Sequence, residues 1–166
     1  MIVNIALLTV TDTRTLKTDK SGNILVSKIN KANHNLVDRK ICKDSKKAIK
    51  KILKHWIKKK NIDVIITTGG TGLTGRDITP EALEEIADKH IPGFGEIFRT
   101  LSLKTVGTSS IQSRACAILA NGKYIFALPG SSGGVTDAWN KILVHQLDIN
   151  HKPCNFVELF PRLKEK

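Results

Sequence analysis

A loop rich in glycine and threonine is the part of this sequence best suited to bind a phosphate group. The run Thr67-Thr68-Gly69-Gly70-Thr71-Gly72 follows an apolar segment at 63–66, and signals for a helix begin at Thr79-Pro80. Glycines leave backbone N–H groups open, and threonines add hydroxyl donors, so such a junction between strand and helix suits an anionic ligand. The candidate phosphate-binding residues of this loop are Gly69, Gly70, Thr71, Gly72 and Thr79.

Two carboxylates add possible chemistry to that loop. Asp77 lies within it, whereas Asp44 follows a predicted strand and precedes a predicted helix, where aspartate is a common N-cap. If the two strand ends are neighbours, the pair could share a magnesium ion, which prefers carboxylate and phosphate oxygens. Such an ion would neutralise charge during the transfer of a phosphate-bearing group. Asp44 and Asp77 are therefore the candidate catalytic and metal-binding residues.

A second small-residue loop, Gly130-Ser131-Ser132-Gly133-Gly134, follows the predicted strand 123–128. It matches the G-x-S-x-G pattern of a hydrolase nucleophile. The nearest acid and base partners, Asp137 and His145, lie on the very next helix and cannot easily reach back over the strand. We therefore favour a phosphate-holding loop in which Ser131 and Ser132 present hydroxyl groups.

Two familiar nucleotide motifs fit the first loop poorly. Residues 70–75 match the G-x-G-x-x-G dinucleotide fingerprint, but that motif begins its helix within the glycines, whereas here the helix signals come later. The same loop approaches a Walker A sequence, but Arg76 and Asp77 stand where lysine and Ser/Thr are required. A nicotinamide site and a P-loop are both disfavoured.

The spacing of apolar residues predicts an α/β fold. Strands alternate with helices, which predicts a mainly parallel sheet covered on both faces, with one antiparallel hairpin closed by Asn121-Gly122. Ligands of such sheets collect beyond the carboxyl ends of the strands, here at 9–14, 67–79 and 129–134. The predicted elements are strand 2–10, helix 23–33, strand 35–41, helix 44–60, strand 63–68, helix 80–89 with Thr79 as N-cap, helix 94–103, strands 115–120 and 123–128, and helix 135–147.

Length and composition argue against several classes of protein. The 166 residues predict one domain, 1–166, and no apolar run approaches the roughly 20 residues needed to span a bilayer. The three cysteines form no Cys-x-x-Cys pair, so we expect neither a disulfide nor a zinc site, and we expect a cytoplasmic protein.

The net charge of +12 raises the alternative of nucleic-acid binding. Residues 43–60 contain nine lysines and one acid, and the lysines fall opposite an apolar helical stripe. A solvated outer helix face is the simpler interpretation, because no aromatic residues interleave with the lysines to stack bases. We therefore expect no membrane contact and disfavour nucleic-acid binding.

The ordered motifs resemble a known family. The loop 67–72, followed by Arg76-Asp77-Ile78-Thr79-Pro80-Glu81-Ala82, is similar to the signature of the MoaB/Mog family of molybdenum cofactor biosynthesis proteins. The resemblance covers essentially the whole chain and is closer to the MoaB branch. Further matching motifs are Thr9-Val10-Thr11-Asp12, Pro92-Gly93-Phe94-Gly95-Glu96, Ser113-Arg114-Ala115 and Leu128-Pro129-Gly130-Ser131.

The resemblance implies a molybdopterin-binding fold, a three-layer α/β/α sandwich that assembles as a homotrimer or homohexamer. It also implies a molybdopterin adenylyltransferase, which uses ATP and Mg²⁺ to adenylylate the terminal phosphate of molybdopterin before molybdenum insertion. The family's catalytic acids map to Asp44 and Asp77. The loop 69–72 would hold pterin or phosphate, Ser131 and Ser132 would lie near the phosphates, and Thr11 would line the first strand-end loop. The alternative is a non-catalytic protein of the same pathway that binds pterin or a nucleotide.

Overall fold

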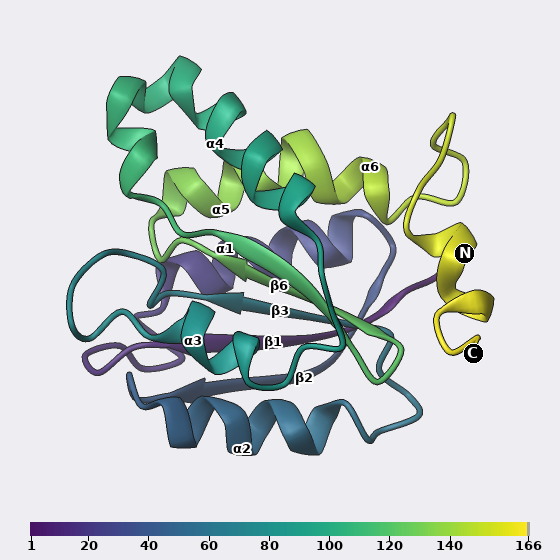
Figure 1. Cartoon of the computed structure of the whole chain (residues 1–166), viewed down its shortest axis with the longest axis horizontal. Coiled ribbons are helices and arrows are strands. Elements are labelled where there is room, and N and C mark those ends of the chain that lie inside the picture. The colour runs from purple at the N-terminus through teal and green to yellow at the C-terminus, as the bar shows by residue number, and fades with distance from the viewer. Residues whose placement is uncertain (166) are drawn as a thin grey trace.

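The computed structural model describes residues 1–165 and contains a six-stranded sheet in the order β2-β1-β3-β6-β5-β4 (Figure 1). Strands β1 (Asn4–Val10), β2 (Asn35–Cys42), β3 (Val64–Thr68) and β6 (Lys123–Leu128) run parallel to one another. Strand β5 (Cys116–Ala120) is antiparallel to β6 and to the short edge strand β4 (Lys89–His90). The predicted mainly parallel sheet with an antiparallel hairpin is confirmed.

Helices cover both faces of the sheet, which confirms the three-layer sandwich. One face carries α1 (Lys20–Lys31), α4 (Pro92–Val106) and the continuous helical segment α5 (Ser132–Ala138), η2 (Trp139–Leu143, a π-helix) and α6 (Val144–Gln146). The other face carries α2 (Lys46–Trp56) and α3 (Thr79–Glu84). The 3₁₀ helices η1 (Gly107–Gln112) and η3 (Val157–Arg162) complete the described helices.

The alternation of side chains along β1 shows why both faces are apolar. Ile5 and Leu7 are buried against α1 and the α5 segment, whereas Ala6 and Leu8 are buried against α2. Successive strand residues point to opposite faces, so a strand covered on both sides must be apolar throughout. Among the described residues, no helix has both the length and the apolar character needed to cross a membrane.

The hairpin that joins β5 and β6 was predicted correctly. Asn121 and Gly122 have φ angles of 49° and 72°. Two positive φ angles in a two-residue loop define the type I′ turn, which matches the twist of the flanking strands.

Several helix boundaries differ from the prediction because side-chain caps lie elsewhere. Helix α1 begins at Lys20 rather than residue 23, since Asp19 caps it by accepting from Gly22 N. Helix α2 is capped by Ser45, which accepts from Ala48 N, and not by Asp44. Helix α5 begins at Ser132 rather than residue 135, because Ser131 accepts from the N–H of Gly134.

The predicted helix 80–89 was wrong at its C-terminal half. The helix ends at Glu84, and Lys89 and His90 pair with Leu119 and Ile118 as the edge strand β4. Thr79 is the first residue of α3 and gives no side-chain cap. The edge strand β4 could not be predicted from the local sequence, because its two residues are defined as a strand only by their pairing with β5.

Candidate functional site

Three loops meet at the carboxyl edge of the parallel strands, as predicted. The loops follow β1, β3 and β6, which are adjacent in the sheet. Gly69 N donates to Leu128 O at 3.0 Å, and Thr68 Oγ1 donates to Pro129 O at 2.8 Å. A Cβ added at Gly130 would lie 3.3 Å from Gly69 Cα, so the two loops are in close contact.

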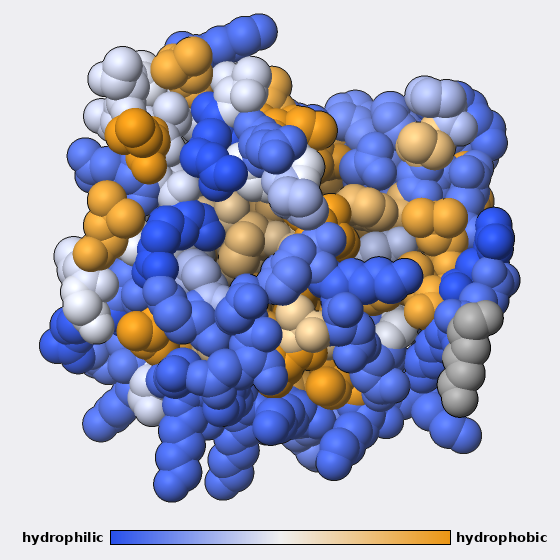
Figure 2. Space-filling model, viewed as in Figure 1, coloured by the Kyte–Doolittle hydropathy of each residue, from blue (hydrophilic) through white to orange (hydrophobic). Residues whose placement is uncertain are grey.

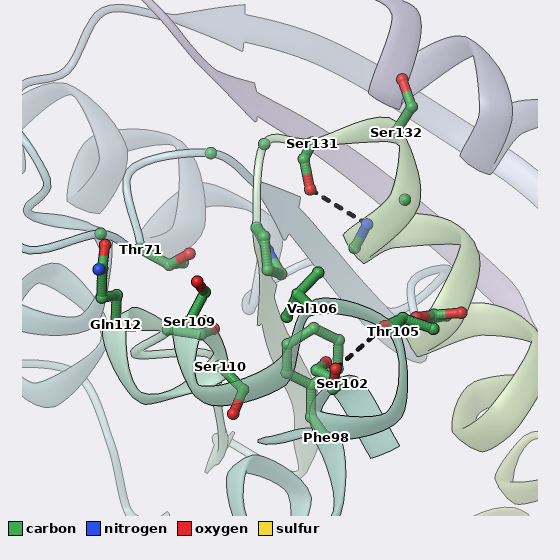
Figure 3. Close-up of a pocket in the computed structure, with 18 of the residues that line it drawn as sticks. Thr71, Phe98, Ser102, Thr105, Val106, Ser109, Ser110, Gln112, Ser131 and Ser132 are labelled. Atoms are coloured by element: carbon green, nitrogen blue, oxygen red, sulfur yellow. Dashed lines mark hydrogen bonds between the residues drawn. The ribbon is translucent and has the colours of Figure 1, made fainter. Parts of the chain in front are cut away.

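The largest opening at this edge, here named the main cavity, has a volume of about 900 Å³ (Figure 3). The glycine loop and Asp77 form one wall, the start of α5 forms a second, and α4 with η1 forms the third. Its described lining comprises Gly69, Gly70, Thr71, Gly72, Asp77, Phe98, Ser102, Thr105, Val106, Ser109, Ser110, Gln112, Ser113, Pro129, Gly130, Ser131, Ser132, Gly133, Gly134, Thr136 and Asp137.

Two glycines are required by the shape of the loop. Gly69 has a φ of +100°, and a Cβ there would lie 2.2 Å from Val10 O. Gly70 has a φ of +68°, and a Cβ there would lie 2.4 Å from Thr79 Oγ1. Glycine is the residue that adopts positive φ without steric penalty, so the chain turns sharply here and brings its backbone to the cavity.

Thr79 has a different place from the one predicted. It is fully buried and outside the cavity lining, and its hydroxyl donates to Gly69 O at 2.8 Å. Its N–H donates to Gly70 O at 3.0 Å. Thr79 therefore holds the carbonyl groups of Gly69 and Gly70 from the buried side of the loop, and its hydroxyl does not face the cavity.

Asp77 lines the main cavity and also shapes the loop. Its carboxylate accepts from Thr74 N at 2.9 Å and from Thr74 Oγ1 at 2.6 Å. The hydrogen bond from the Thr74 hydroxyl outweighs partial burial and lowers the pKa of Asp77 below its ordinary value. The group is therefore an anion at neutral pH, able to hold a cation but not to donate a proton.

Asp44 lies near Asp77 but outside the residues that line the cavities. Its N–H donates to Asp12 Oδ1 at 3.2 Å, which ties the start of α2 to the loop after β1. Asp12 also forms an ion pair with Arg76 from the glycine loop. Burial, and then the negative charge of Asp77, raise the pKa of Asp44.

The two carboxylates are compatible with magnesium but do not form a complete metal cage. Within residues 1–165, no group of three or more His, Cys, Asp or Glu side chains is placed to hold a metal ion. Magnesium is commonly bound by one or two carboxylates, substrate phosphates and water, so two mutually repelling carboxylates are a suitable partial donor set.

A second, smaller cavity adjoins the first and has a volume of about 310 Å³. It supplies the cationic groups of Arg14 and Lys20, which the main cavity lacks in its described lining. Thr11 lines it and accepts from Arg14 N at 3.3 Å, so its hydroxyl shapes the loop after β1. The two cavities share the wall formed by Gly69, Gly130, Ser131 and Ser132.

A buried charge network supports the smaller cavity. The Asp19 carboxylate accepts from Thr9 Oγ1 at 2.6 Å, from Ser21 Oγ at 3.2 Å, from Gly22 N at 2.9 Å and from Arg39 Nη2 at 2.9 Å. Burial opposes ionisation of Asp19, but these hydrogen bonds and the charge of Arg39 outweigh it and lower its pKa. The network fixes the start of α1, where Lys20 and Ser21 face the cavity.

The third wall of the main cavity was not predicted from the sequence. Side chains from α4 and η1 close it, although residues 94–103 were predicted only as a helix and 107–112 were not assigned (Figure 3). The sequence feature that could have indicated this wall is the group of uncharged polar residues Ser109, Ser110, Gln112 and Ser113. Arg114, noted in the sequence only as part of a motif, donates to the carbonyl oxygens of the glycine loop.

The lysine-rich segment forms the outer face of α2, as predicted. Figure 2 shows long hydrophilic side chains projecting along the edge of the molecule where α2 lies. Lys46 and Lys50 form ion pairs with Glu85, while the apolar stripe of Ile49, Leu53 and Trp56 is buried. No α2 residue lines either cavity among the described residues, so this charge is separate from the site.

Comparisons with known proteins agree with this fold. Residues 6–149 match the probable molybdopterin binding domain family. Molybdenum cofactor biosynthesis protein B of Escherichia coli (strain K12) is 44% identical over 161 residues, which cover 97% of this chain and 93% of that protein. The protein of the same name from Staphylococcus carnosus is 46% identical over 153 residues, covering 88% of this chain and 87% of the relative.

Solved structures give the same relationship. A crystal structure of molybdenum cofactor biosynthesis protein B superimposes with a TM-score of 0.90 at 37% identity, covering 100% of this chain and 98% of the other. The tungsten cofactor synthesizing protein MoaB of Pyrococcus furiosus gives a TM-score of 0.77 at 34% identity, covering 86% and 91% of the two chains. The chain therefore belongs to the molybdopterin-binding domain family and is a homologue of molybdenum cofactor biosynthesis protein B.

Proposed function

We propose that this protein acts in molybdenum cofactor biosynthesis and adenylylates molybdopterin with ATP and Mg²⁺. The observation that carries the proposal is the pair of adjoining cavities with a shared wall of glycines and serines. The large one is lined by hydroxyl groups, apolar groups and the carboxylates of Asp77 and Asp137, and the small one by Arg14, Lys20 and Asp19, which is paired with Arg39. A transferase that joins two phosphate-bearing substrates needs such adjacent sites.

The residues that line the two cavities suit different parts of the substrates. Ligand pockets of drug-sized molecules have volumes of about 300–1,000 Å³, so the main cavity is large enough for a ring system. The smaller cavity offers Arg14 and Lys20, whose charges suit phosphate oxygens. The hydroxyl of Ser131 and the open backbone at Gly69 lie on the shared wall, where the phosphates of both substrates would meet.

In the proposed reaction an oxygen of the terminal phosphate of molybdopterin attacks the α-phosphorus of ATP. A phosphorus–oxygen bond forms there, the bond from the α-phosphorus to the oxygen bridging the α- and β-phosphates breaks, and pyrophosphate leaves with that oxygen. The protein contributes positioning and charge, because phosphoryl-type transfer needs little covalent chemistry from side chains. Asp44 and Asp77 would hold Mg²⁺, which supplies charge neutralisation at the phosphates.

The proposal is tested by pyrophosphate release. We expect release from ATP only when molybdopterin and Mg²⁺ are both present. Asp77→Asn should lower the rate at least about a hundredfold, equivalent to about 2.7 kcal/mol of transition-state stabilisation. Glu165→Gln, at an exposed ion pair with Arg162, serves as the control and should leave the rate unchanged. No turnover by the wild-type protein with authentic molybdopterin would remove the enzyme claim.

A second candidate function is binding of the pterin or nucleotide without transfer. Two observations favour it: the Asp77 carboxylate is already engaged by Thr74, and Asp44 lies outside the cavity lining. Calorimetry would distinguish the candidates. Tight binding of molybdopterin without any adenylylated product would select the binding protein.

The proposed assembly is a homotrimer or homohexamer. Large apolar side chains are exposed on the protruding α4–η1 segment, including Leu103, Val106 and Ile111. Exposed apolar groups of this kind are common at protein interfaces. Light scattering coupled to size-exclusion chromatography measures the mass directly, and a monomer at micromolar concentration would contradict the assembly.

A further inference from the structure

We propose that Arg114 is the positioning residue of this site, which clamps both ends of the exposed segment 72–77 and so orients Asp77 and the glycine loop toward the main cavity. The proposal deepens the proposed function, on which its catalytic consequence rests. The clamp itself is a property of the loop and can be measured without turnover.

One guanidinium group spans the open turn. Arg114 Nε donates to Gly72 O at 2.7 Å, and Arg114 Nη2 donates to Asp77 O at 2.6 Å. The main chain of Arg114 adds a third link, because its N–H donates to Thr71 O at 2.9 Å. The two carbonyl groups bound by the side chain lie at opposite ends of the turn, so the guanidinium group links these two ends.

The turn has little other support from packing. Leu73 at its tip is 67% exposed, and Thr74 and Gly75 are also exposed. Arg76 pairs with Asp12 from the loop after β1, but Arg76 is 74% exposed, and exposed ion pairs contribute little. The shape of the turn therefore depends on hydrogen bonds, those between Thr74 and Asp77 and those from Arg114 to its carbonyl groups, rather than on buried apolar area.

The clamp is anchored on rigid elements. Arg114 precedes β5, and the remaining guanidinium nitrogen, Nη1, forms an ion pair with Glu81 on α3. The Arg114 side chain is only 31% exposed. Arginine presents its donors in a fixed planar fork, whereas lysine is a flexible point charge, so Arg114→Lys cannot reproduce contacts in three directions.

Loss of the Arg114 contacts would affect the position of Asp77. Its backbone oxygen is held by Arg114, while its carboxylate caps the turn through Thr74 and lines the main cavity. If the guanidinium is removed, two carbonyl groups lose their donor and the turn is free to open. The carboxylate and the N–H groups of residues 70–72 would then be disordered relative to the cavity, which weakens both ligand binding and any chemistry.

The test uses the full chain with Arg114→Lys and Arg114→Met, and Arg162→Met at an exposed ion pair as the matched control. Hydrogen–deuterium exchange measures the amides of residues 71–78. We expect exchange there to accelerate at least about tenfold in both Arg114 variants, equivalent to about 1.4 kcal/mol of lost local stability, with core strands unchanged. Affinity for Mg²⁺-ATP, measured by calorimetry, should fall about tenfold or more.

Several results would overturn the clamp. Unchanged exchange at 71–78 in Arg114→Met would do so, as would full restoration of exchange protection and affinity by Arg114→Lys. If Arg114→Met does not fold, Glu81→Ala decides the question, because it removes the partner of Arg114 Nη1 while leaving the contacts of Nε and Nη2, and it should give a smaller acceleration confined to the same segment. If the wild-type protein lacks transferase activity, the proposed function fails, while the exchange data still decide the role of Arg114.

Discussion

Replacement of Asp19 by asparagine tests whether the charge network beside the smaller cavity stabilises the fold. The Asp19 side chain is 2% exposed and Arg39 is 18% exposed, so the pair is largely removed from water. Asparagine keeps the shape of the side chain and one oxygen that can accept from Gly22 N. It removes the negative charge that faces Arg39 and Thr9.

The magnitude follows from the burial of the pair. Removing one partner of a buried ion pair destabilises a protein by about 3–5 kcal/mol, because the remaining charge is left without compensation. Arg39 keeps some contact with solvent, so we expect the lower end, about 3 kcal/mol. For a chain of this size, each kcal/mol lowers the melting temperature by about 2–4 °C, which predicts a decrease of about 6–12 °C.

Urea denaturation, followed by the circular dichroism of the helices, measures the free energy of unfolding. Glu165→Gln is the control and should change it by less than about 0.5 kcal/mol. A double-mutant cycle with Arg39→Met isolates the coupling between the two charges. A loss below about 1 kcal/mol in Asp19→Asn, with no coupling to Arg39, would refute the reasoning.

The hydrogen bonds and ion pair of Asp19 also make the free energy of unfolding depend on pH. The pKa of Asp19 in the folded state lies below its ordinary value of 3.8, so its contribution to stability is complete above that value. The contribution is lost as the pH falls through the lower, folded-state value. The difference in unfolding free energy between wild type and Asp19→Asn should therefore shrink below about pH 4, and a constant difference from pH 7 to pH 3 would contradict the assignment.

Three further predictions concern the glycine loop, the thiols and the lysine face. Gly69→Ala should destabilise the protein by more than the about 1–3 kcal/mol of an unfavourable φ, because its Cβ meets Val10 O, and urea unfolding measures the loss. Burial raises the pKa of Cys42 and of Cys116 to about 11, so at pH 8 a thiol reagent should rapidly label Cys154 alone; three fast-reacting thiols would show this to be wrong. The outer face of α2 should not bind duplex DNA or RNA at 150 mM salt, and binding with a log–log salt slope of several units in a filter assay would instead support nucleic-acid recognition.

The loop 69–72 illustrates what local sequence determines. Its glycines follow an apolar strand, and its position at the sheet edge could be predicted because parallel strands end at the same edge. The type I′ turn at Asn121-Gly122 was equally readable, since the two residue types that tolerate positive φ stand side by side. In both cases the determining residues are neighbours along the chain.

The function of Thr79 and Arg114 could not be read in this way. Thr79 looked like a helix cap, yet its hydroxyl binds the carbonyl of Gly69, ten residues earlier. Arg114 reaches Gly72 across 42 residues, and the α4–η1 wall joins the cavity only because the sheet places it beside the glycine loop.

The order of most strands and helices, the parallel sheet and the edge at which the three loops meet could be read from the sequence, because apolar periodicity and turn residues act over short distances. The tertiary structure alone decided which side chains line the cavities, which of them are buried as supports, and that Asp44 stands beside rather than within the lining. Those outcomes depend on hydrogen bonds and packing between segments far apart in the chain, and no local pattern records them.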